Sequence, residues 1–356
     1  MTSSSRPRIA AVVTVPGPYV MSQAEAGEYL ERHYEARLSA ASRRRLRAIF
    51  AHPAIGRRHF AFADPDEIRR ETRDERVARF TDQALELAGQ AASRSLTAAG
   101  LAAAEIEGLV VNTCTGYLCP GLSTYLIERL GLPPTLKAYD LLGSGCGGSV
   151  PNLEVAEGIL GRQPAGKGAV LSVSVEICTA TFQMGNDLSL ILSNALFGDG
   201  AAAAVLWRRP DGYELVASAS RYVPEQREAI RYVYREGELH NQLSLELPDL
   251  VKVAAGQVVE ELLAPRKLRP ADVRHWAVHT GGEKIVQAIG EEIGLSDQQL
   301  AATRRVLADY GNMSSPTVWF VLKELEIRGI VENDWIILLT FGAGLAAHGY
   351  LLRKRA

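Results

Sequence analysis

A cysteine, a histidine and an asparagine of this 356-residue chain each stand in a glycine-bounded turn. They are Cys146 in Gly143-Ser-Gly-Cys-Gly-Gly148, His279 before Thr-Gly-Gly282, and Asn312 in Tyr310-Gly-Asn-Met313. A thiol beside an imidazole can exchange a proton with it and accept an acyl group. An amide is no base at neutral pH, but it donates hydrogen bonds to an oxyanion or enolate. Together these residue types indicate acyl transfer, whereas each alone is also typical of a buried cysteine, a strand-end histidine or a helix cap.

The turn around Cys146 is predicted to join a strand to a helix. An apolar run from Tyr139 to Leu142 precedes it, and apolar residues recur with helical period from Val150 to Leu160. Glycine on both sides of the cysteine permits a sharp turn and a close approach of substrate to the main chain. Because a helix N-terminus favours an anion, we expect the thiol of Cys146 to be biased toward thiolate.

The second half of the chain repeats this arrangement. Trp276 to His279 is predicted as a strand ending at the Gly-Gly turn, and Asn312 precedes a predicted helix. Two copies of one such unit would bring Cys146 and Asn312 together at a pseudo-two-fold axis. We therefore predict an N-terminal half over residues 1–208 that carries the cysteine and a C-terminal half over 209–356 that carries the histidine and the asparagine, divided at the turn-forming stretch 208–212.

The remaining apolar patterns are typical of an α/β protein. Continuous apolar character predicts strands at 106–111, 168–176 and 335–341, which suits a sheet covered on both faces. Helical periodicity predicts helices at 22–37, 40–50, 80–101, 122–130, 251–263 and 282–290. Residues 64–76 lack a periodic apolar face and are predicted as a charged surface segment.

Composition excludes several classes of protein. With 47% apolar residues, 22% charged residues and a net charge of −2, the chain suits a globular core and argues against a nucleic-acid or membrane surface. The apolar run that follows Arg6 stops at Pro16 and indicates a first strand rather than a signal peptide, so we expect a cytoplasmic protein. Four cysteines fit neither a disulfide scaffold nor a zinc pattern, and we expect reduced thiols and no metal.

Five motifs together resemble the type III polyketide synthases, the chalcone- and stilbene-synthase family. They are the Cys146 turn, His279-Thr-Gly-Gly282, Tyr310-Gly-Asn-Met-Ser-Ser315, Leu196-Phe-Gly-Asp-Gly-Ala-Ala202 and Phe341-Gly-Ala-Gly-Leu345. Three departures from the plant pattern point to bacterial members. Thr280 stands where proline or alanine is usual, Ala343 replaces a proline, and residues 239–248 lack the second gatekeeper phenylalanine.

The resemblance implies a fold and a reaction. The fold is thiolase-like, with two duplicated halves in a five-layered αβαβα core, in a homodimer. An acyl starter moves from coenzyme A to Cys146, malonyl-CoA loses CO2 to an enolate held by His279 and Asn312, and the enolate attacks the thioester. Coenzyme A thioesters are substrates and no cofactor is implied. After several rounds the chain cyclises to a resorcinol, a pyrone or a dihydroxyphenylacetate-type product.

The resemblance also implies roles for further positions. Phe182 falls on a gatekeeper position between the coenzyme A tunnel and the cavity, Cys114 and Thr115 on the acyl pocket, Ser314 beside the active site, and Gly342 in the cavity loop. For coenzyme A, Arg45 matches a basic contact, but Ala48 and His52 occupy the next two contact positions. Arg58 and Lys284 are candidates to substitute, with Gly281 beside them, or a carrier protein delivers the starter.

Three other functions fit parts of the pattern. A β-ketoacyl synthase III-like enzyme has the same three residue types and performs one condensation with a carrier-protein substrate, but its histidine normally stands in a His-Gln-Ala-Asn setting. Hydroxymethylglutaryl-CoA synthase needs a glutamate base that has no counterpart at the matching position. A non-catalytic thiolase-fold subunit would usually have lost the nucleophile, and Cys146 is present.

Overall fold

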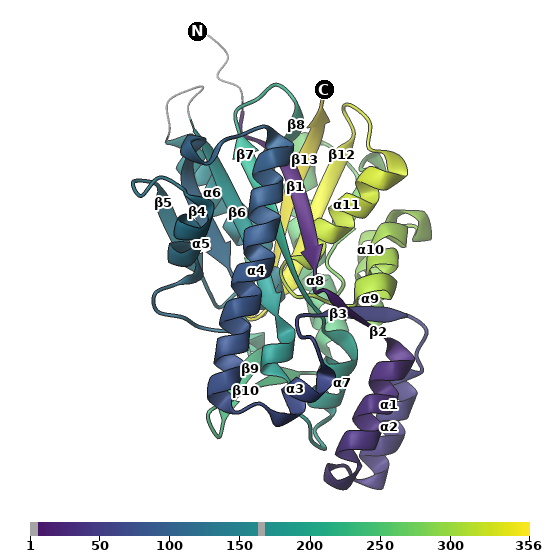
Figure 1. Cartoon of the computed structure of the whole chain (residues 1–356). Coiled ribbons are helices and arrows are strands. Elements are labelled where there is room, and N and C mark those ends of the chain that lie inside the picture. The colour runs from purple at the N-terminus through teal and green to yellow at the C-terminus, as the bar shows by residue number, and fades with distance from the viewer. Residues whose placement is uncertain (1–5, 163–167) are drawn as a thin grey trace.

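The computed structural model describes residues 6–162 and 168–356. Thirteen strands lie in this part of the chain (Figure 1). They are β1 Arg8–Pro16, β2 Tyr19–Ser22, β3 Arg57–Phe60, β4 Ile106–Asn112, β5 Lys137–Leu141, β6 Ala169–Ile177, β7 Asp199–Trp207, β8 Gly212–Tyr222, β9 Ile230–Arg235, β10 Glu238–Leu243, β11 His275–Val278, β12 Trp335–Gly342 and β13 Ala346–Arg355.

Nine of these strands form one sheet in the order β11-β12-β13-β8-β1-β7-β6-β4-β5. The order has an internal repeat. On one side β4 and β6 are parallel and β7 and β1 follow antiparallel, and on the other side β11 and β12 are parallel and β13 and β8 follow antiparallel. The strands β1 and β8 join the two sets. The predicted boundary at residue 208 falls between β7 and β8, and the division into two domains there stays a prediction.

Eleven α-helices accompany the strands in the described residues. They are α1 Gln23–Tyr34, α2 Ala40–Phe50, α3 Pro65–Arg70, α4 Arg73–Ala99, α5 Leu122–Leu130, α6 Ser149–Gly161, α7 Leu188–Leu196, α8 Leu247–Leu263, α9 Glu283–Ile293, α10 Asp297–Tyr310 and α11 Thr317–Gly329.

Helices α6 and α11 form the central layer. Each contacts strands from both sets, and their apolar residues, such as Leu153 and Trp319, belong to one buried cluster. Helix α4 covers the outer face of the strands β1, β6 and β7 (Figure 1). Helix α8, with α9 packed against it, builds a separate outer cluster over β8 and β13. This packing places the N-termini of α6 and α11, which follow Cys146 and Asn312, in the middle of the molecule.

Helices α3, α4 and α10 differ from the prediction. Residues 64–76, predicted as a charged surface segment without a periodic apolar face, contain α3, which Asp64 caps, and the start of α4. Helix α4 begins at Arg73 rather than near residue 80, because Thr72 and Glu75 form a capping box at its start. Helix α10, which had not been predicted, starts at a similar capping box of Ser296 and Gln299. Capping residues determine where these helices begin, and a search for apolar periodicity does not detect capping residues.

Candidate active site

The Cys146 turn is tightly packed between β5 and α6. Gly143 and Gly145 have φ values of 89° and 55°, which side chains disfavour, and a short 3-10 helix over Gly145–Gly147 carries the cysteine. The end of β12 presses against this turn. A Cβ atom at Gly342 would lie 2.3 Å from the carbonyl oxygen of Ser144, so the predicted pocket residue Gly342 provides close backbone approach behind the cysteine.

His279 follows β11 and is completely buried. Its backbone N–H donates to the carbonyl of Leu339 in the neighbouring strand β12 at 2.9 Å. Its ring meets the ring of Phe341 edge-on, with centroids 5.0 Å apart. Neither ring nitrogen of His279 has a hydrogen-bond partner in the described part of the chain. Both nitrogens are therefore available to a substrate.

Asn312 is held by its backbone and by its own side-chain oxygen. Its N–H donates to the carbonyl of Leu196, and its carbonyl accepts from the N–H of Gly198, each at 2.9 Å. The amide oxygen of Asn312 accepts from the N–H of Ser314 at 2.7 Å. This orients the amide group, whose side chain also hydrogen bonds with Cys146.

A cavity of about 410 Å³ brings the three residues together. Cys146, His279 and Asn312 all line it, with Phe197 and Phe341 beside them. Its other walls come from the end of α2, the start of α8, the turn before α9 with the predicted Gly281, and the first turn of α9 with the predicted Lys284. The prediction that Cys146 and Asn312 come together therefore agrees with the geometry, which places His279 on the same cavity.

Burial keeps the cysteine and the histidine neutral, contrary to the expected thiolate. Burial raises the pKa of the Cys146 thiol to about 12, against hydrogen bonds with Ser314 and Asn312 that lower it. Burial alone lowers the pKa of His279 to about 3. Removal from water outweighs the partial charge at the start of α6, because the cost of burying an ion exceeds the helix-terminus contribution of about 1 kcal/mol. Both shifts favour a thiol and a neutral imidazole over the ion pair.

A buried carboxylate behind Cys146 gathers the other predicted pocket residues. Glu176 of β6 accepts hydrogen bonds from the N–H of Cys114 at 2.9 Å, the hydroxyl of Thr115 at 3.0 Å and the hydroxyl of Ser315 at 2.6 Å. The hydroxyl of Ser314 reaches it at 3.4 Å. Cys114, Thr115 and Ser314 thus surround Glu176 and are outside the lining of the large cavity. Sequence reasoning missed Glu176, although a lone charged residue in an apolar strand was a usable signal.

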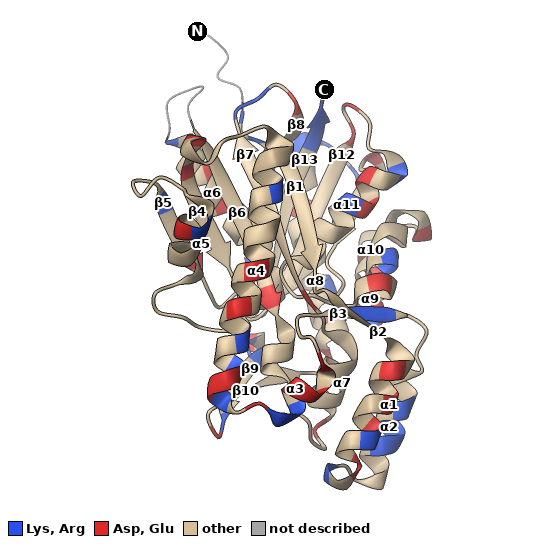
Figure 2. Ribbon diagram, viewed as in Figure 1, with Lys and Arg blue, Asp and Glu red and all other residues tan. Residues whose placement is uncertain are grey.

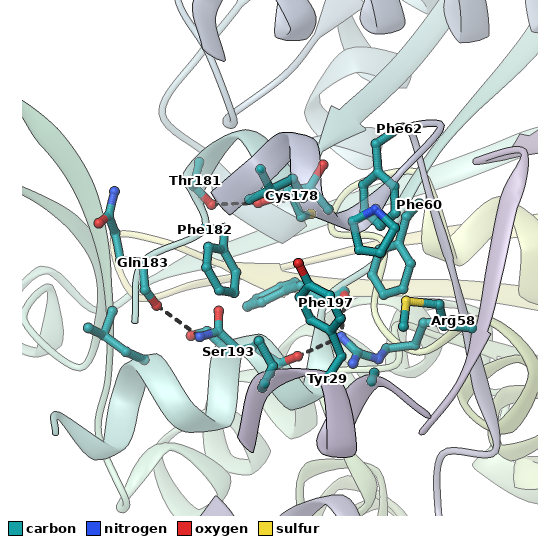
Figure 3. A pocket seen from close by; sticks show the side chains of 18 of the residues that line it. Tyr29, Arg58, Phe60, Phe62, Cys178, Thr181, Phe182, Gln183, Ser193 and Phe197 are labelled. Atoms are coloured by element: carbon teal, nitrogen blue, oxygen red, sulfur yellow. Dashed lines mark hydrogen bonds between the residues drawn. The ribbon is translucent and has the colours of Figure 1, made fainter. Parts of the chain in front are cut away.

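The gatekeeper role of Phe182 stays a prediction. This residue lines a second cavity of about 80 Å³, between α1, α7 and the segment after β6 (Figure 3). There it packs against Tyr34, with ring centroids 5.7 Å apart. Phe197 lines both this cavity and the large cavity that Cys146 lines. In the chain, α7 lies between the two phenylalanines.

Arg58 is also placed differently from its predicted role as a phosphate contact. Its side chain is only 3% exposed and lines the second cavity (Figure 3). Its guanidinium donates to the carbonyls of Asn194 and Phe197 at 2.6 and 2.8 Å and to the side chain of Gln23 at 2.9 Å. Burial lowers its pKa to about 9. Arg58 therefore fastens the end of α7 and does not reach the mouth of the large cavity.

The other two predicted basic residues remain at the surface near that mouth. Lys284 is exposed and lines the cavity, whereas Arg45 is exposed on α2 one turn before the lining residues Ala48 and Ile49. The acidic residues Glu25, Glu28 and Glu31 of α1 and the four arginines of α2 lie on neighbouring helices (Figure 2). Two other arginines of α2 form ion pairs. Arg43 pairs with Glu35, which follows α1, and Arg47 pairs with Glu31 of α1.

His348 lies directly behind the nucleophile turn. Its Nδ1 is 2.8 Å from the hydroxyl of Ser220, and a Cβ atom at Gly147 would meet its ring at 3.0 Å. Burial lowers the pKa of His348 to about 4, below its value of about 6.5 in an unfolded chain. The folded protein then binds this proton less readily than the unfolded chain. Stability is present above pH 6.5 and is lost as the pH falls toward 4.

We expect the free energy of unfolding to fall by about 2 kcal/mol between pH 7 and pH 5 because the unfolded chain protonates His348 more readily. Urea unfolding of the wild type and of His348→Gln at pH 7, 6 and 5 measures this, and the glutamine variant should lose about 2 kcal/mol less than the wild type. His33→Gln, at an exposed position of α1, is the control and should follow the wild type. An equal loss in His348→Gln and the wild type would contradict the assignment.

Two absences complete the description of the site and the surface. Within residues 6–162 and 168–356, no cluster of three or more histidine, cysteine, aspartate or glutamate side chains is arranged to hold a metal ion. In the same residues, no helix combines the length and the apolar character that crossing a membrane requires.

Comparison with models of protein families shows which family the chain belongs to. Residues 23–274 match the model described as FAE1/type III polyketide synthase-like protein, and residues 214–355 match the C-terminal domain of chalcone and stilbene synthases. The chain belongs to the type III polyketide synthases. The synthase is accordingly an acyltransferase that condenses coenzyme A thioesters into polyketides, and the alternative of a β-ketoacyl synthase III-like enzyme is not favoured.

Characterised relatives of the synthase are bacterial. It is 32% identical to 3,5-dihydroxyphenylacetyl-CoA synthase of Streptomyces toyocaensis over 315 residues, which cover 85% of this chain and 80% of the relative. It is 34% identical to 1,3,6,8-tetrahydroxynaphthalene synthase of Streptomyces peucetius subsp. caesius over 276 residues, covering 76% and 73%.

Solved structures confirm the predicted thiolase-like fold. PKS-I from the brown alga Ectocarpus siliculosus superimposes with a TM-score of 0.89 at 27% identity and 99% coverage of both chains. The type III domain of Steely1 from Dictyostelium superimposes with a TM-score of 0.90 at 24% identity, covering 99% of this chain and 100% of that one, and shows the fold alone.

Proposed function

We propose that Cys146, His279 and Asn312 carry the chemistry of the synthase. The observation that supports this most directly is their position on one cavity, with both ring nitrogens of His279 unpartnered and the Asn312 amide oriented by Ser314. A histidine nitrogen without a protein partner can move a proton or donate one hydrogen bond. An oriented amide can donate a second to the same oxygen.

Acyl loading starts from the neutral thiol and imidazole. A ring nitrogen of His279 takes the Cys146 proton as the sulfur attacks the thioester carbonyl of the starter. The carbon–sulfur bond to coenzyme A breaks, and the leaving thiolate takes the proton back from the imidazolium. Because the ions exist only transiently, the high pKa of Cys146 and the low pKa of His279 are compatible with this step.

Extension uses the same cavity. Malonyl-CoA loses CO2, and the electron pair of the broken carbon–carbon bond forms an enolate whose oxygen accepts hydrogen bonds from His279 and Asn312. The enolate carbon attacks the thioester carbonyl on Cys146, and the cysteine leaves as a thiolate that takes a proton from solvent. The product is a coenzyme A thioester longer by two carbons. The apolar rings of Phe197 and Phe341 exclude water from the enolate.

We propose a hydroxylated aromatic product of the dihydroxyphenylacetate type, formed from malonyl-CoA. The supporting observation is the 30–32% identity to three 3,5-dihydroxyphenylacetyl-CoA synthases over more than four fifths of the chain. Resorcinols and pyrones are the other product classes that this reaction gives. A cavity of about 410 Å³ limits the growing chain to a short polyketide.

Incubation with malonyl-CoA, alone and with acetyl to long-chain acyl-CoAs, tests this proposal. Mass spectrometry of the small molecules and of the intact protein should find CO2 release, an acyl adduct on Cys146 and a cyclised product. A product from malonyl-CoA alone whose mass is that of a dihydroxyphenylacetate identifies the dihydroxyphenylacetate class. Extension only from a carrier-bound acyl group would overturn coenzyme A delivery and favour a carrier protein.

Three further properties belong to this proposal. We place the synthase in the cytoplasm, using acyl-CoA and malonyl-CoA without a cofactor. We also place it in a homodimer, because apolar side chains near Cys119 are exposed: Tyr117 is 69%, Tyr139 48% and Leu142 50% exposed. A second copy would cover this surface and the exposed edge strand β5.

Lys284 and Arg45 are proposed to bind the phosphates of coenzyme A. Loss of one exposed charge contact costs about 1 kcal/mol, so Lys284→Ala and Arg45→Ala should each raise the KM for malonyl-CoA about fivefold with kcat unchanged. Initial rates over a range of malonyl-CoA concentrations measure this. Arg47→Ala is the matched control on α2, because Glu31 already pairs with its guanidinium. A KM for Lys284→Ala and Arg45→Ala equal to that of the control removes both residues from the assignment.

A further inference from the structure

The residue after His279 carries a hydroxyl that the reaction steps do not use. Thr280 is completely buried, and its Oγ1 donates to the carbonyl of Gly311 at 2.9 Å. Gly311 immediately precedes Asn312. One hydrogen bond therefore connects the turn that carries the histidine to the turn that carries the asparagine, although 31 residues separate its donor and its acceptor in the chain.

The His279 ring depends on its backbone for orientation. Since neither ring nitrogen has a partner in the described residues, no hydrogen bond of the ring fixes its direction. The backbone of the turn is fixed on three sides instead. His279 N–H donates to Leu339, its carbonyl accepts from Gly281 at 3.0 Å, and a Cβ atom at Gly281 would lie 2.5 Å from the ring of Phe341. The hydrogen bond of Thr280 holds the backbone of this turn on its remaining side, which faces Asn312.

The acceptor of this hydrogen bond is rigid. Gly311 has φ of +68°, and a Cβ atom there would lie 2.6 Å from the carbonyl of Leu196 and 2.9 Å from Cγ of Arg58. The neighbouring Asn312 is bound through both its N–H and its carbonyl. The Gly311 carbonyl is thus a fixed point, and the hydroxyl of Thr280 ties the histidine turn to it.

We infer that Thr280 is a positioning residue that sets the separation of His279 and Asn312 at the enolate oxygen. The inference rests on the proposed roles of those two residues. Two donors stabilise one oxygen only when both lie at hydrogen-bond distance from it, so a shift of the histidine turn weakens that step. Loading of Cys146 does not need the His279–Asn312 separation and is less sensitive to it.

Thr280→Val removes the hydroxyl at nearly constant volume, and Thr280→Ser keeps it. We expect kcat for malonyl-CoA decarboxylation to fall about tenfold in Thr280→Val with KM unchanged, and acylation of Cys146 by acetyl-CoA to stay within about twofold. Thr280→Ser should stay within about threefold of the wild type in both assays. Quenched-flow decarboxylation assays and intact-protein mass spectrometry provide the two rates.

Three outcomes would overturn the inference: wild-type decarboxylation in Thr280→Val, equal losses of decarboxylation and loading, or the same loss in Thr280→Ser. If the valine variant does not fold, Thr280→Ala compared with Thr280→Ser decides the same question. His279→Ala is measured alongside as an independent test. Wild-type decarboxylation in His279→Ala would reject the proposed role of the histidine. If His279→Ala loses decarboxylation, that role is supported, and the Thr280 variants then test the positioning inference separately.

Discussion

Cys146→Ala is expected to abolish acyl loading and to lower product formation by about a thousandfold or more, because no other thiol lines the large cavity. Intact-protein mass spectrometry after incubation with acetyl-CoA measures loading. Malonyl-CoA decarboxylation should continue in this variant, since the proposed mechanism assigns the enolate to His279 and Asn312 and not to the cysteine. The separation of the two activities is the signature of a nucleophile that acts only in acyl transfer.

Cys119→Ala is the matched control for this experiment. Cys119 is exposed, follows a surface loop and should be dispensable for loading. An acyl adduct on Cys146→Ala, located by peptide mapping to Cys114 or Cys178, would show that another thiol accepts the starter. Loss of loading in Cys119→Ala to the same extent as in Cys146→Ala would likewise contradict the assignment.

Asn312→Ala is expected to slow malonyl-CoA decarboxylation by about a hundredfold to a thousandfold, the effect of removing one preorganised oxyanion donor. Acyl loading of Cys146 should remain within about an order of magnitude, because that step uses the thiol and the imidazole. Stopped assays of CO2 release and mass spectrometry of the protein give the two rates.

Asn312→Asp refines this test at constant size. It keeps an oxygen that can accept from the N–H of Ser314 but replaces the amide donor with an acceptor. If the amide acts as a donor to the enolate, the aspartate variant should be at least as slow as the alanine variant. Decarboxylation near the wild-type rate in either variant would remove Asn312 from the proposed site.

The three central residues could be predicted from the sequence because each lies in a local signal. An apolar strand, a glycine-bounded turn and a helical pattern surround Cys146, and a glycine-containing turn that opens a helix recurs at Asn312. Parallel strands end at one edge of a sheet, so residues that follow such strands meet there. The duplicated strand order then brings the turns to the middle of the molecule.

The residues that support the site could not be predicted, because their roles depend on distant partners. Glu176 collects hydrogen bonds from two segments more than 60 and more than 130 residues away in the chain. Phe182 and Phe197 flank α7, and only its packing decides which of them reaches the cavity. Arg45 and Arg58 are both basic residues near a predicted cavity mouth, but the second points inward to carbonyl groups at the end of α7.

The neutral state of the Cys146–His279 pair also bears on the chemical durability of the synthase. Peroxides and electrophilic alkylating agents attack thiolates, and a thiol whose pKa is raised to about 12 presents almost none at neutral pH. The nucleophile becomes reactive when a thioester carbonyl lies beside it and the imidazole takes its proton. Iodoacetamide, a reagent that brings no such carbonyl, should therefore label Cys146 slowly. Resistance to oxidation between turnovers follows from the same burial that excludes water from the enolate.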